Sequence, residues 1–249
     1  MTQTSNPTQP MMDLIKVSKT YNPDVHALED VTFSINKGEM VYLIGRSGSG
    51  KTTLLKLISR IEKPTKGMIE VAGLDIAKIP RNRLYRLRRK IGMVYQDFKL
   101  LPERTVAANI AIAMEVVYRK RSFIHKRTKE LLIRLGLSAK KHTLAAELSR
   151  GEQQRVTIAR AVANQPDIIL ADEPTGNLDA ETTGRVMDLF NEMNNKGTTL
   201  LIATHDRDIY QQGGRRIIEL RYGRQVENVR AAPQPDGIQY ETANTIQSY

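Results

Sequence analysis

Cysteine is absent from the 249-residue chain. This absence excludes a disulfide framework and a cysteine-ligated zinc site, and it favours a reducing compartment. Long hydrophobic runs are also missing, because the longest, such as 110–114 and 200–203, have four or five residues, whereas a membrane span needs roughly 18. The first ten residues lack the basic and apolar blocks of a signal peptide. The sequence therefore predicts a cytosolic protein without a membrane-spanning segment.

Positive charge is in excess, with 38 Lys and Arg against 27 Asp and Glu, a formal net charge of +11. Two windows carry this excess, because residues 81–90 and 119–129 each hold six basic residues and no acidic residue. Aromatic residues suited to base stacking are scarce in these windows, with only Tyr85 and Phe123. The charge is therefore a local feature, and no nucleic-acid partner is expected.

The composition changes at both ends of the chain. Residues 1–10 and 228–249 are polar and without periodicity, which is typical of flexible tails. Between them, at 11–227, short apolar runs alternate with helical patterns, which indicates a single α/β domain with a parallel sheet. The clearest strands, expected to be buried on both faces, are 40–44, 168–171 and 200–203. A segment at about 98–163 has helical spacing and no obvious strand, so we expect it to be an inserted helical subdomain.

A glycine-rich loop follows the first of these strands and precedes a helical run. Strand, loop and helix in this order are the context that a phosphate-binding P-loop requires. The glycines let backbone N–H groups surround phosphate oxygens at the helix start, Lys51 neutralises phosphate charge, and the Thr52 hydroxyl can ligate Mg²⁺. The predicted nucleotide-binding residues of the loop are Gly45, Arg46, Ser47, Gly48, Ser49, Gly50, Lys51, Thr52 and Thr53.

Two acids follow the buried strand at 168–171. Because the carboxyl ends of parallel strands share one edge of a sheet, Asp172 and Glu173 are expected beside the P-loop. Neighbouring strand residues point to opposite faces, which would give the two acids different tasks. Asp172 fits the Mg²⁺ shell, and Glu173 fits the base that orients and polarises the attacking water.

A histidine follows the strand at 198–203. This strand is expected to deliver His205 to the same edge, where its imidazole would contact the terminal phosphate and hold the water. Three other histidines are interpreted as structural: His26, His125 and His142. We therefore predict a catalytic role for His205 alone among the four.

The run 148–155 opens another helix. Ser149 and Glu152, three residues apart, predict a capping box, which alone would explain both residue types. A serine hydroxyl beside free N–H groups at a helix start is equally an anion site. The local sequence does not choose between these two interpretations.

Taken in order, these segments resemble the nucleotide-binding subunits of ABC transporters over about residues 12–226. The set comprises the P-loop, Gln96 after a strand, a signature at 148–152, the strand with its two acids, a Gly-Asn-Leu-Asp run at 176–179, and His205. The resemblance implies an α/β P-loop NTPase fold of the ABC type, with a mainly parallel core sheet, an N-terminal antiparallel β part and a helical subdomain. It also implies ATPase activity, with ATP and Mg²⁺ as cofactors.

The resemblance assigns further roles residue by residue. Tyr21 would stack on adenine, Gln96 would sense Mg²⁺ and the attacking water, and Asp179 would lie in a loop that couples two sites. A head-to-tail homodimer is implied in the ATP state. In it, the signature residues Ser149, Gly151 and Glu152 of one subunit would close over ATP bound to the P-loop of the other, which favours the anion-site interpretation.

Within the family, the segments at 87–101, 151–162, 170–179 and 203–206 resemble the FtsE subunits, which act in cell division with the membrane protein FtsX. The Gln-Asp-Phe run at 96–98 and Ala203 favour this group over relatives that serve lipoprotein release or the export of macrolides and antimicrobial peptides. The implied partner is an integral, permease-like subunit of the FtsX type. The implied location is peripheral, on the cytoplasmic side of the cell membrane.

Two alternatives fit the sequence less well. ABC ATPases that act on nucleic acids carry tandem cassettes, long coiled coils or zinc modules, whereas this chain has one cassette and no cysteine. A regulatory cassette that binds ATP without turnover is disfavoured because Glu173 and His205 are both present. ATP hydrolysis on a membrane partner is the interpretation that remains.

Arg150 departs from the family pattern, since the signature normally has glycine at this position. Arginine lacks the conformational freedom of glycine and brings a charge near the phosphate of the other subunit. It would either stabilise transition-state charge or slow turnover by distorting the loop. Dimerisation is expected to survive, because Ser149 and Gly151 are kept.

The resemblance also predicts on which side of the molecule the two basic windows lie. In an ABC subunit, the helical subdomain and the Gln96 loop form the side that docks on the membrane partner. The windows would then face anionic headgroups or acidic segments of that partner. The alternative is that they are two solvated helix faces.

Overall fold

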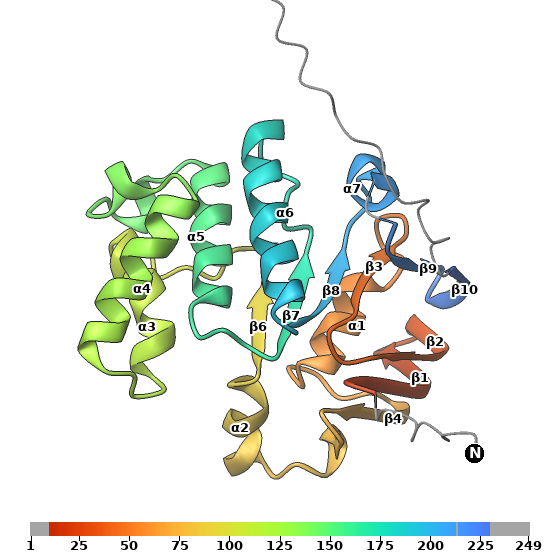
Figure 1. The fold of residues 1–249 in the computed structure, drawn as a ribbon. Coiled ribbons are helices and arrows are strands. Elements are labelled where there is room, and N and C mark those ends of the chain that lie inside the picture. The colour runs from red at the N-terminus through yellow and green to blue at the C-terminus, as the bar shows by residue number, and fades with distance from the viewer. Residues whose placement is uncertain (1–9, 213, 230–249) are drawn as a thin grey trace, which may run out of the picture.

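The computed structural model describes residues 10–212 and 214–229, which fold around two β-sheets (Figure 1). In the larger sheet the strand order is β10-β9-β3-β8-β7-β6. Its strands are β3 (Met40–Ile44), β6 (Ile91–Val94), β7 (Ile168–Asp172), β8 (Thr199–Ala203), β9 (Arg216–Arg221) and β10 (Arg224–Val229). All neighbouring pairs are parallel except β10 with β9. The predicted α/β fold with a mainly parallel sheet is confirmed.

The smaller sheet is antiparallel and has the order β2-β1-β4-β5. Its strands are β1 (Met12–Tyr21), β2 (Val25–Ile35), β4 (Lys66–Val71) and β5 (Leu74–Asp75). It lies beside helix α1, on the opposite side of the parallel sheet from α3 and α4 (Figure 1). The N-terminal antiparallel part implied by the family resemblance is therefore present.

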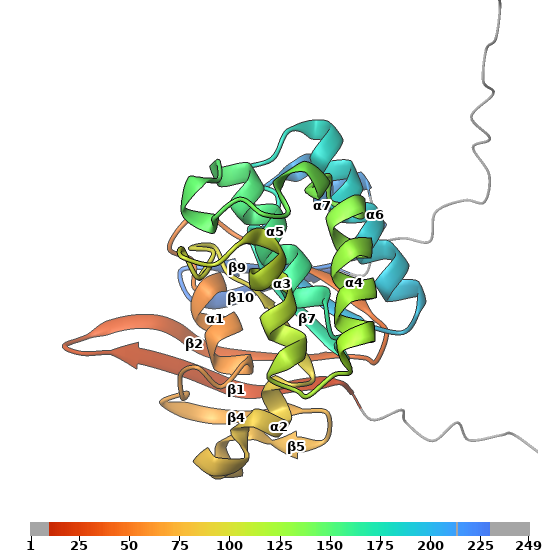
Figure 2. The same ribbon diagram turned by 90° about the vertical axis from the view of Figure 1, so that its left-hand side faces the viewer.

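Helices cover both faces of the parallel sheet. The α-helices are α1 (Lys51–Ile58), α2 (Leu84–Arg88), α3 (Val106–Glu115), α4 (Arg121–Arg134), α5 (Arg150–Val162), α6 (Ala180–Asn195) and α7 (Arg207–Gln212). Short 3₁₀ helices occupy Ile76–Lys78, Arg81–Arg83, Ser138–Lys140 and Ala145–Glu147. Helices α3, α4 and α5 form one group (Figure 2), and α5 contacts β6. Within the described ranges, none of the helices combines the length and the apolar character that crossing a bilayer demands.

The observed strand boundaries differ slightly from the predicted ones. β3 matches its predicted range, β7 continues through Asp172, and β8 begins at Thr199. β10 reaches Val229, two residues beyond the domain end expected at 227, because its last residues pair with β9 through the backbone. Such pairing is independent of side-chain polarity, so composition alone could not reveal it. The rest of the predicted tails, 1–9 and 230–249, lies outside the described residues.

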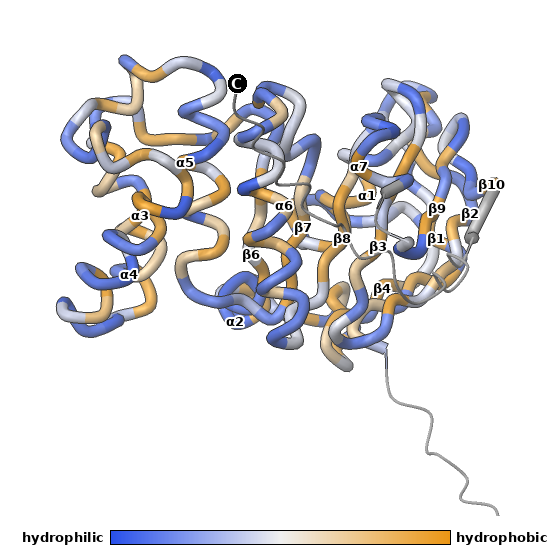
Figure 3. The backbone as a smooth tube through the Cα atoms, turned by 45° about the horizontal axis from the view of Figure 1, so that its top comes forward, coloured by the Kyte–Doolittle hydropathy of each residue, from blue (hydrophilic) through white to orange (hydrophobic). Residues whose placement is uncertain are grey.

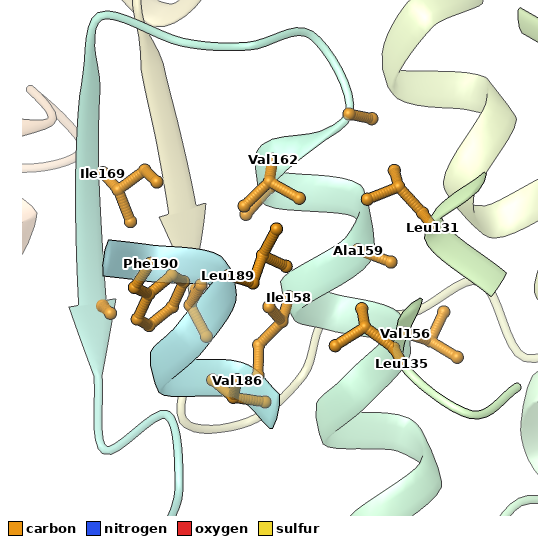
Figure 4. Packing of buried hydrophobic residues seen from close by; sticks show 14 of the residues in the cluster. Leu131, Leu135, Val156, Ile158, Ala159, Val162, Ile169, Val186, Leu189 and Phe190 are labelled. Atoms are coloured by element: carbon orange, nitrogen blue, oxygen red, sulfur yellow. The ribbon is translucent and has the colours of Figure 1, made fainter. Parts of the chain in front are cut away.

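The central strands are buried on both faces, as their apolar runs predict. Along β7, Ile169 and Ala171 pack in one hydrophobic cluster with α3, α4, α5 and α6, whereas Ile168 and Leu170 pack in a second cluster with α1 and the antiparallel sheet. The residues divide in this way because successive side chains of a strand point to opposite faces of the sheet. Figure 4 shows Phe190 of α6 and residues of α5 in the first cluster, and hydrophobic colour follows β3, β7 and β8 in Figure 3. The strands that carry the predicted site residues at their ends are therefore packed on both faces.

Candidate functional site

The carboxyl ends of three neighbouring parallel strands open into one cavity. β3, β8 and β7 lie side by side, so the loops that follow them meet at one edge of the sheet. The cavity there has a volume of about 590 Å³. Its lining brings together most of the predicted site with three residues from the start of β2: Val25, His26, Ala27, Arg46, Ser47, Gly48, Ser49, Gly50, Lys51, Thr52, Thr53, Gln96, Asp172, Glu173 and His205.

Two glycines of the P-loop hold backbone conformations that other residues avoid. Gly50 has a φ of 104° and Gly45 a φ of 151°. A Cβ atom at Gly50 would lie 2.6 Å from the carbonyl oxygen of Ala27, and one at Gly45 would lie 2.3 Å from that of Leu220. The loop therefore lies tightly against its neighbours, and α1 starts without a side-chain cap or an acidic residue in its first turn. Its uncapped N–H groups are suited to binding an anion.

Lys51 lies over the P-loop and is almost fully buried. Its Nζ donates hydrogen bonds to the carbonyl oxygens of Gly45, at 2.7 Å, and Arg46, at 3.3 Å. The same Nζ is 3.9 Å from Oε1 of Glu173. The ammonium group is thus fixed between the P-loop and the carboxylate, where it can neutralise the charge of a bound phosphate.

Asp172 ends β7 and is buried at 2% exposure. Burial raises the pKa of its carboxyl above the ordinary value, and the Glu173 charge adds to this rise, whereas a hydrogen bond with Thr52 and the Lys51 charge oppose it. Its Oδ1 has no hydrogen-bond partner among the described residues. A buried carboxylate oxygen without a partner, beside a threonine hydroxyl, matches the hard oxygen ligands that Mg²⁺ prefers. The residues present therefore fit a magnesium ion that is completed by phosphate oxygens and water.

Glu173 lies just outside β7 in a left-handed backbone conformation. Its φ is 49°, and its N–H donates to the carbonyl oxygen of Ala203 in β8 at 2.9 Å. The prediction that strand alternation separates Asp172 from Glu173 is wrong, because Glu173 no longer belongs to the strand. A turn held by β8, rather than the pleat of β7, gives the two carboxylates different surroundings.

His205 and Glu173 contact each other above this edge. Nδ1 of His205 is 2.9 Å from Oε1 of Glu173. The imidazole follows β8 after the buried Thr204, whose N–H donates to the carbonyl oxygen of Leu43 at 3.1 Å. The His205 side chain is 71% exposed, so it approaches the half-buried carboxylate from the solvent side. The structure therefore brings together the two side chains that the sequence predicts to place the attacking water.

Gln96 reaches the cavity from the end of β6. The loop that follows it is attached to α5, because Arg160 donates to the carbonyl oxygens of Phe98 and Lys99 at 2.7 and 2.6 Å. The Thr157 hydroxyl of α5 also donates to the carbonyl of Phe98, at 3.2 Å. A displacement of α5 would therefore be transmitted to the backbone next to Gln96.

Tyr21 does not line the cavity. Its hydroxyl donates to Oε2 of Glu62 at 2.5 Å, and Nζ of Lys19 lies 4.7 Å from the centre of its ring. Burial and the neighbouring Glu62 raise the pKa of the Tyr21 hydroxyl. The residues that line this side are Val25, His26 and Ala27, which the sequence had not indicated, because no motif marks a contact made through the Ala27 carbonyl.

The signature residues and Asp179 also lie outside the cavity. Ser149 caps α5, with its Oγ accepting from Glu152 N–H at 3.3 Å and its own N–H donating to Glu152 Oε2 at 2.9 Å. The capping box predicted from the sequence is therefore present. Asp179 caps α6 by accepting from the Thr182 N–H at 2.8 Å. A Cβ atom at Gly151 would lie 2.9 Å from the carbonyl oxygen of Asn177, so the start of α5 lies close to the loop before α6.

Arg150 occupies the first turn of α5 and is exposed. Its backbone is helical and it is not among the described residues with positive φ, so this position does not require the conformational freedom of glycine. Distortion of the loop by Arg150 is therefore absent from the structure.

Replacing Arg150 by glycine is expected to leave ATP-dependent dimerisation unchanged, because the Ser149 cap and the close approach at Gly151 do not depend on the Arg150 side chain. Crosslinking with ATP, together with phosphate release, would measure dimerisation and turnover separately. A parent protein that stays monomeric while the glycine variant dimerises would contradict the expectation.

Comparisons with known proteins agree with this geometry. The family model for the ABC transporter matches residues 28–176. The chain is 46% identical to the cell division ATP-binding protein FtsE of Bacillus subtilis over 213 residues, which cover 86% of this chain and 93% of the relative. It is 46% identical to FtsE of Mycobacterium tuberculosis over 219 residues, covering 88% and 95% of the two chains.

A solved structure has the same fold. The dimeric ATP-binding cassette MJ0796, in a post-hydrolysis state bound to ADP and Pi, superimposes with a TM-score of 0.84 at 36% sequence identity. The match covers 89% of this chain and 99% of that cassette. The fold, the P-loop cavity and these relatives agree, and the chain therefore belongs to the ABC transporter family as an ATP-hydrolysing subunit of the FtsE group.

Proposed function

We propose that this ATPase forms an ATP-bound homodimer on the cytoplasmic face of the cell membrane, where it changes the conformation of an FtsX-type membrane partner in cell division. The observation that carries the proposal is the division of the predicted site into two parts. One part, the P-loop with Asp172, Glu173, His205 and Gln96, lines the cavity, whereas Ser149, Gly151 and Asp179 lie outside it. A second copy of the chain would supply the second part.

In this mechanism the chain acts by positioning and by charge stabilisation. The N–H groups at the start of α1 and the Lys51 ammonium bind the phosphates and neutralise the charge that develops on the terminal phosphoryl group. Glu173 accepts a proton from the attacking water at a carboxylate oxygen, and His205 holds that carboxylate and the water in place. Mg²⁺, held by Asp172 and Thr52 with Gln96 nearby, would supply charge neutralisation between the outer phosphates.

Dimerisation completes the site in this proposal. Ser149, Gly151 and Glu152 at the start of α5 would close over the ATP that is bound to the P-loop of the other copy. Tyr21 would stack on adenine. The homodimer is supported by the related cassette MJ0796, which is dimeric with ADP and Pi bound. The exposed position of Ser149 at a helix start leaves it accessible to a second chain.

The membrane partner would dock in a second cavity, next to the Gln96 loop. This groove of about 900 Å³ lies between α2, β6, α3 and α5. It combines apolar side chains, among them Ile61 and Met93, with the cations Lys99 and Arg160. A segment of the partner that binds here would contact the loop held by α5, so that movement on either side would be transmitted to the ATP site. The names of the FtsE relatives support a role in cell division.

Co-purification from detergent would test this proposal. A four-helix permease of the FtsX type is expected to remain bound to the wild-type chain, and Ile61→Asp in the groove, at a position 44% exposed, should abolish its recovery. Ile133→Asp, at a position 59% exposed on α4 and outside the groove, is the matched control and should leave the complex intact. A different permease, or equal loss with both variants, would reject the FtsX-type assignment or the groove.

A further inference from the structure

Two projecting segments flank the groove that is proposed above as the docking site of the membrane partner. The first contains α2 and the 3₁₀ turn before it, and the second is the turn between α3 and α4. Residues of both segments line the same groove, and both views place them at the lower end of the ribbon (Figures 1 and 2). We call these segments, residues 81–89 and 116–121, the basic rim.

The positive charge of the basic rim is not neutralised by the protein. Its eight cations are all exposed, and none forms an ion pair with another described residue: Arg81, Arg83, Arg86, Arg88, Arg89, Arg119, Lys120 and Arg121. Some exposed cations elsewhere on the surface are ion-paired, as in Arg224 with Glu29 and Lys196 with Glu192. Because these eight cations lie in two short segments without an ion-paired acid, the rim presents a net positive field, which attracts an anionic surface.

Exposed apolar and aromatic groups accompany these charges. Tyr118, at the tip of the α3–α4 turn, is 90% exposed, Val116 beside it is 62% exposed, and Tyr85 on α2 is 47% exposed. The Arg89 guanidinium lies 4.9 Å from the centre of the Tyr85 ring. Exposed tyrosines next to arginine and lysine are typical of the boundary between lipid headgroups and acyl chains.

We propose that the basic rim binds anionic phospholipid directly, with Tyr118 and Val116 entering the headgroup region and the cations contacting lipid phosphates. The shape favours a membrane over a nucleic acid, because the charges lie on two separate projections on either side of a largely apolar groove rather than along one continuous basic channel. The proposal extends the membrane location given above, but it concerns a property of the purified chain and requires neither the partner nor ATP.

Vesicle co-sedimentation of the purified full chain tests the proposal. The wild type is expected to bind vesicles of phosphatidylglycerol and phosphatidylcholine, to bind pure phosphatidylcholine far less, and to dissociate as ionic strength rises. Replacing Arg119, Lys120 and Arg121 together by glutamine should weaken binding to the anionic vesicles by about 100-fold, since each cation near a lipid surface contributes about a factor of five. Tyr118→Ser should weaken binding while leaving its salt dependence unchanged.

A matched variant removes equal charge from the opposite end of the molecule. Replacing Arg104, Lys141 and Arg207 by glutamine, three exposed cations outside the rim, should reduce binding by less than the rim variant does. Unchanged thermal melting of both variants would show that folding is intact. Equal effects of the two triple variants, or wild-type binding to neutral vesicles as strong as to anionic ones, would overturn the proposal. It would also be overturned if duplex DNA displaced the chain from vesicles and the rim variant lost DNA binding, which would identify the rim as a nucleic-acid interface.

The test is independent of the partner experiment. Loss of permease binding with retained vesicle binding would reject only the FtsX-type assignment. Retained permease binding without vesicle binding would reject only the lipid contact.

Discussion

Replacing Glu173 by glutamine is expected to lower ATP turnover by about 100-fold or more and to trap an ATP-bound dimer. Glutamine keeps the size of the side chain and can still contact His205, but it cannot accept a proton from water. The Lys51 and P-loop contacts that bind phosphate do not require the Glu173 charge. Phosphate release would measure turnover, and size-exclusion chromatography in the presence of ATP would measure the dimer.

Glu103→Gln provides the matched control for this change. Glu103 is exposed and lies outside the cavity, so its replacement should leave both turnover and the monomer–dimer equilibrium as in the wild type. Turnover close to wild type in the Glu173→Gln variant would reject the assignment of Glu173 as the base. A slow variant that stays monomeric with ATP would instead show that Glu173 contributes to nucleotide binding.

Replacing Phe190 by alanine is expected to lower the free energy of unfolding by about 3–5 kcal/mol. Phe190 is fully buried on α6 and packs in the cluster that contains Ile169 of β7 and Leu189 (Figure 4). Truncation would leave a cavity between α6 and the sheet, which the surrounding close-packed side chains can fill only in part. Denaturant unfolding followed by circular dichroism would measure the change.

An exposed apolar residue supplies the comparison for Phe190. Ile133→Ala removes apolar atoms from a position that is 59% exposed, so its cost should stay below about 0.5 kcal/mol. Similar losses in the two variants would show that the α6 interface contributes no more to stability than the surface does.

The strands and the P-loop were predictable because their signals are local. A continuous apolar run over 40–44, followed by glycines and Lys51, determines strand, turn and helix within a short stretch of chain. The parallel order of β3, β8 and β7 then brings Asp172, Glu173 and His205 together without further information. The strand pattern, together with the rule that parallel strands end at the same edge of a sheet, was therefore enough to predict that these residues lie close together.

Features that depend on contacts between distant segments were not predictable in this way. The left-handed turn at Glu173 is set by a hydrogen bond to Ala203, thirty residues later, and neither residue type signals it. The contribution of Val25, His26 and Ala27 to the cavity arises because Gly50 allows the P-loop to approach the Ala27 carbonyl. The last pairs of β10 likewise depend on the backbone of β9.

The shared carboxylate of Glu173 has a consequence for the timing of the reaction. In the structure, Oε1 of Glu173 faces both the Lys51 ammonium and the His205 imidazole. In the proposed mechanism, an arriving phosphate would compete for Lys51, and as it draws the ammonium away, Glu173 would keep His205 and the incoming water as its partners. The substrate would thus remove the cation that pairs with the proposed base, so that phosphate binding would precede water activation.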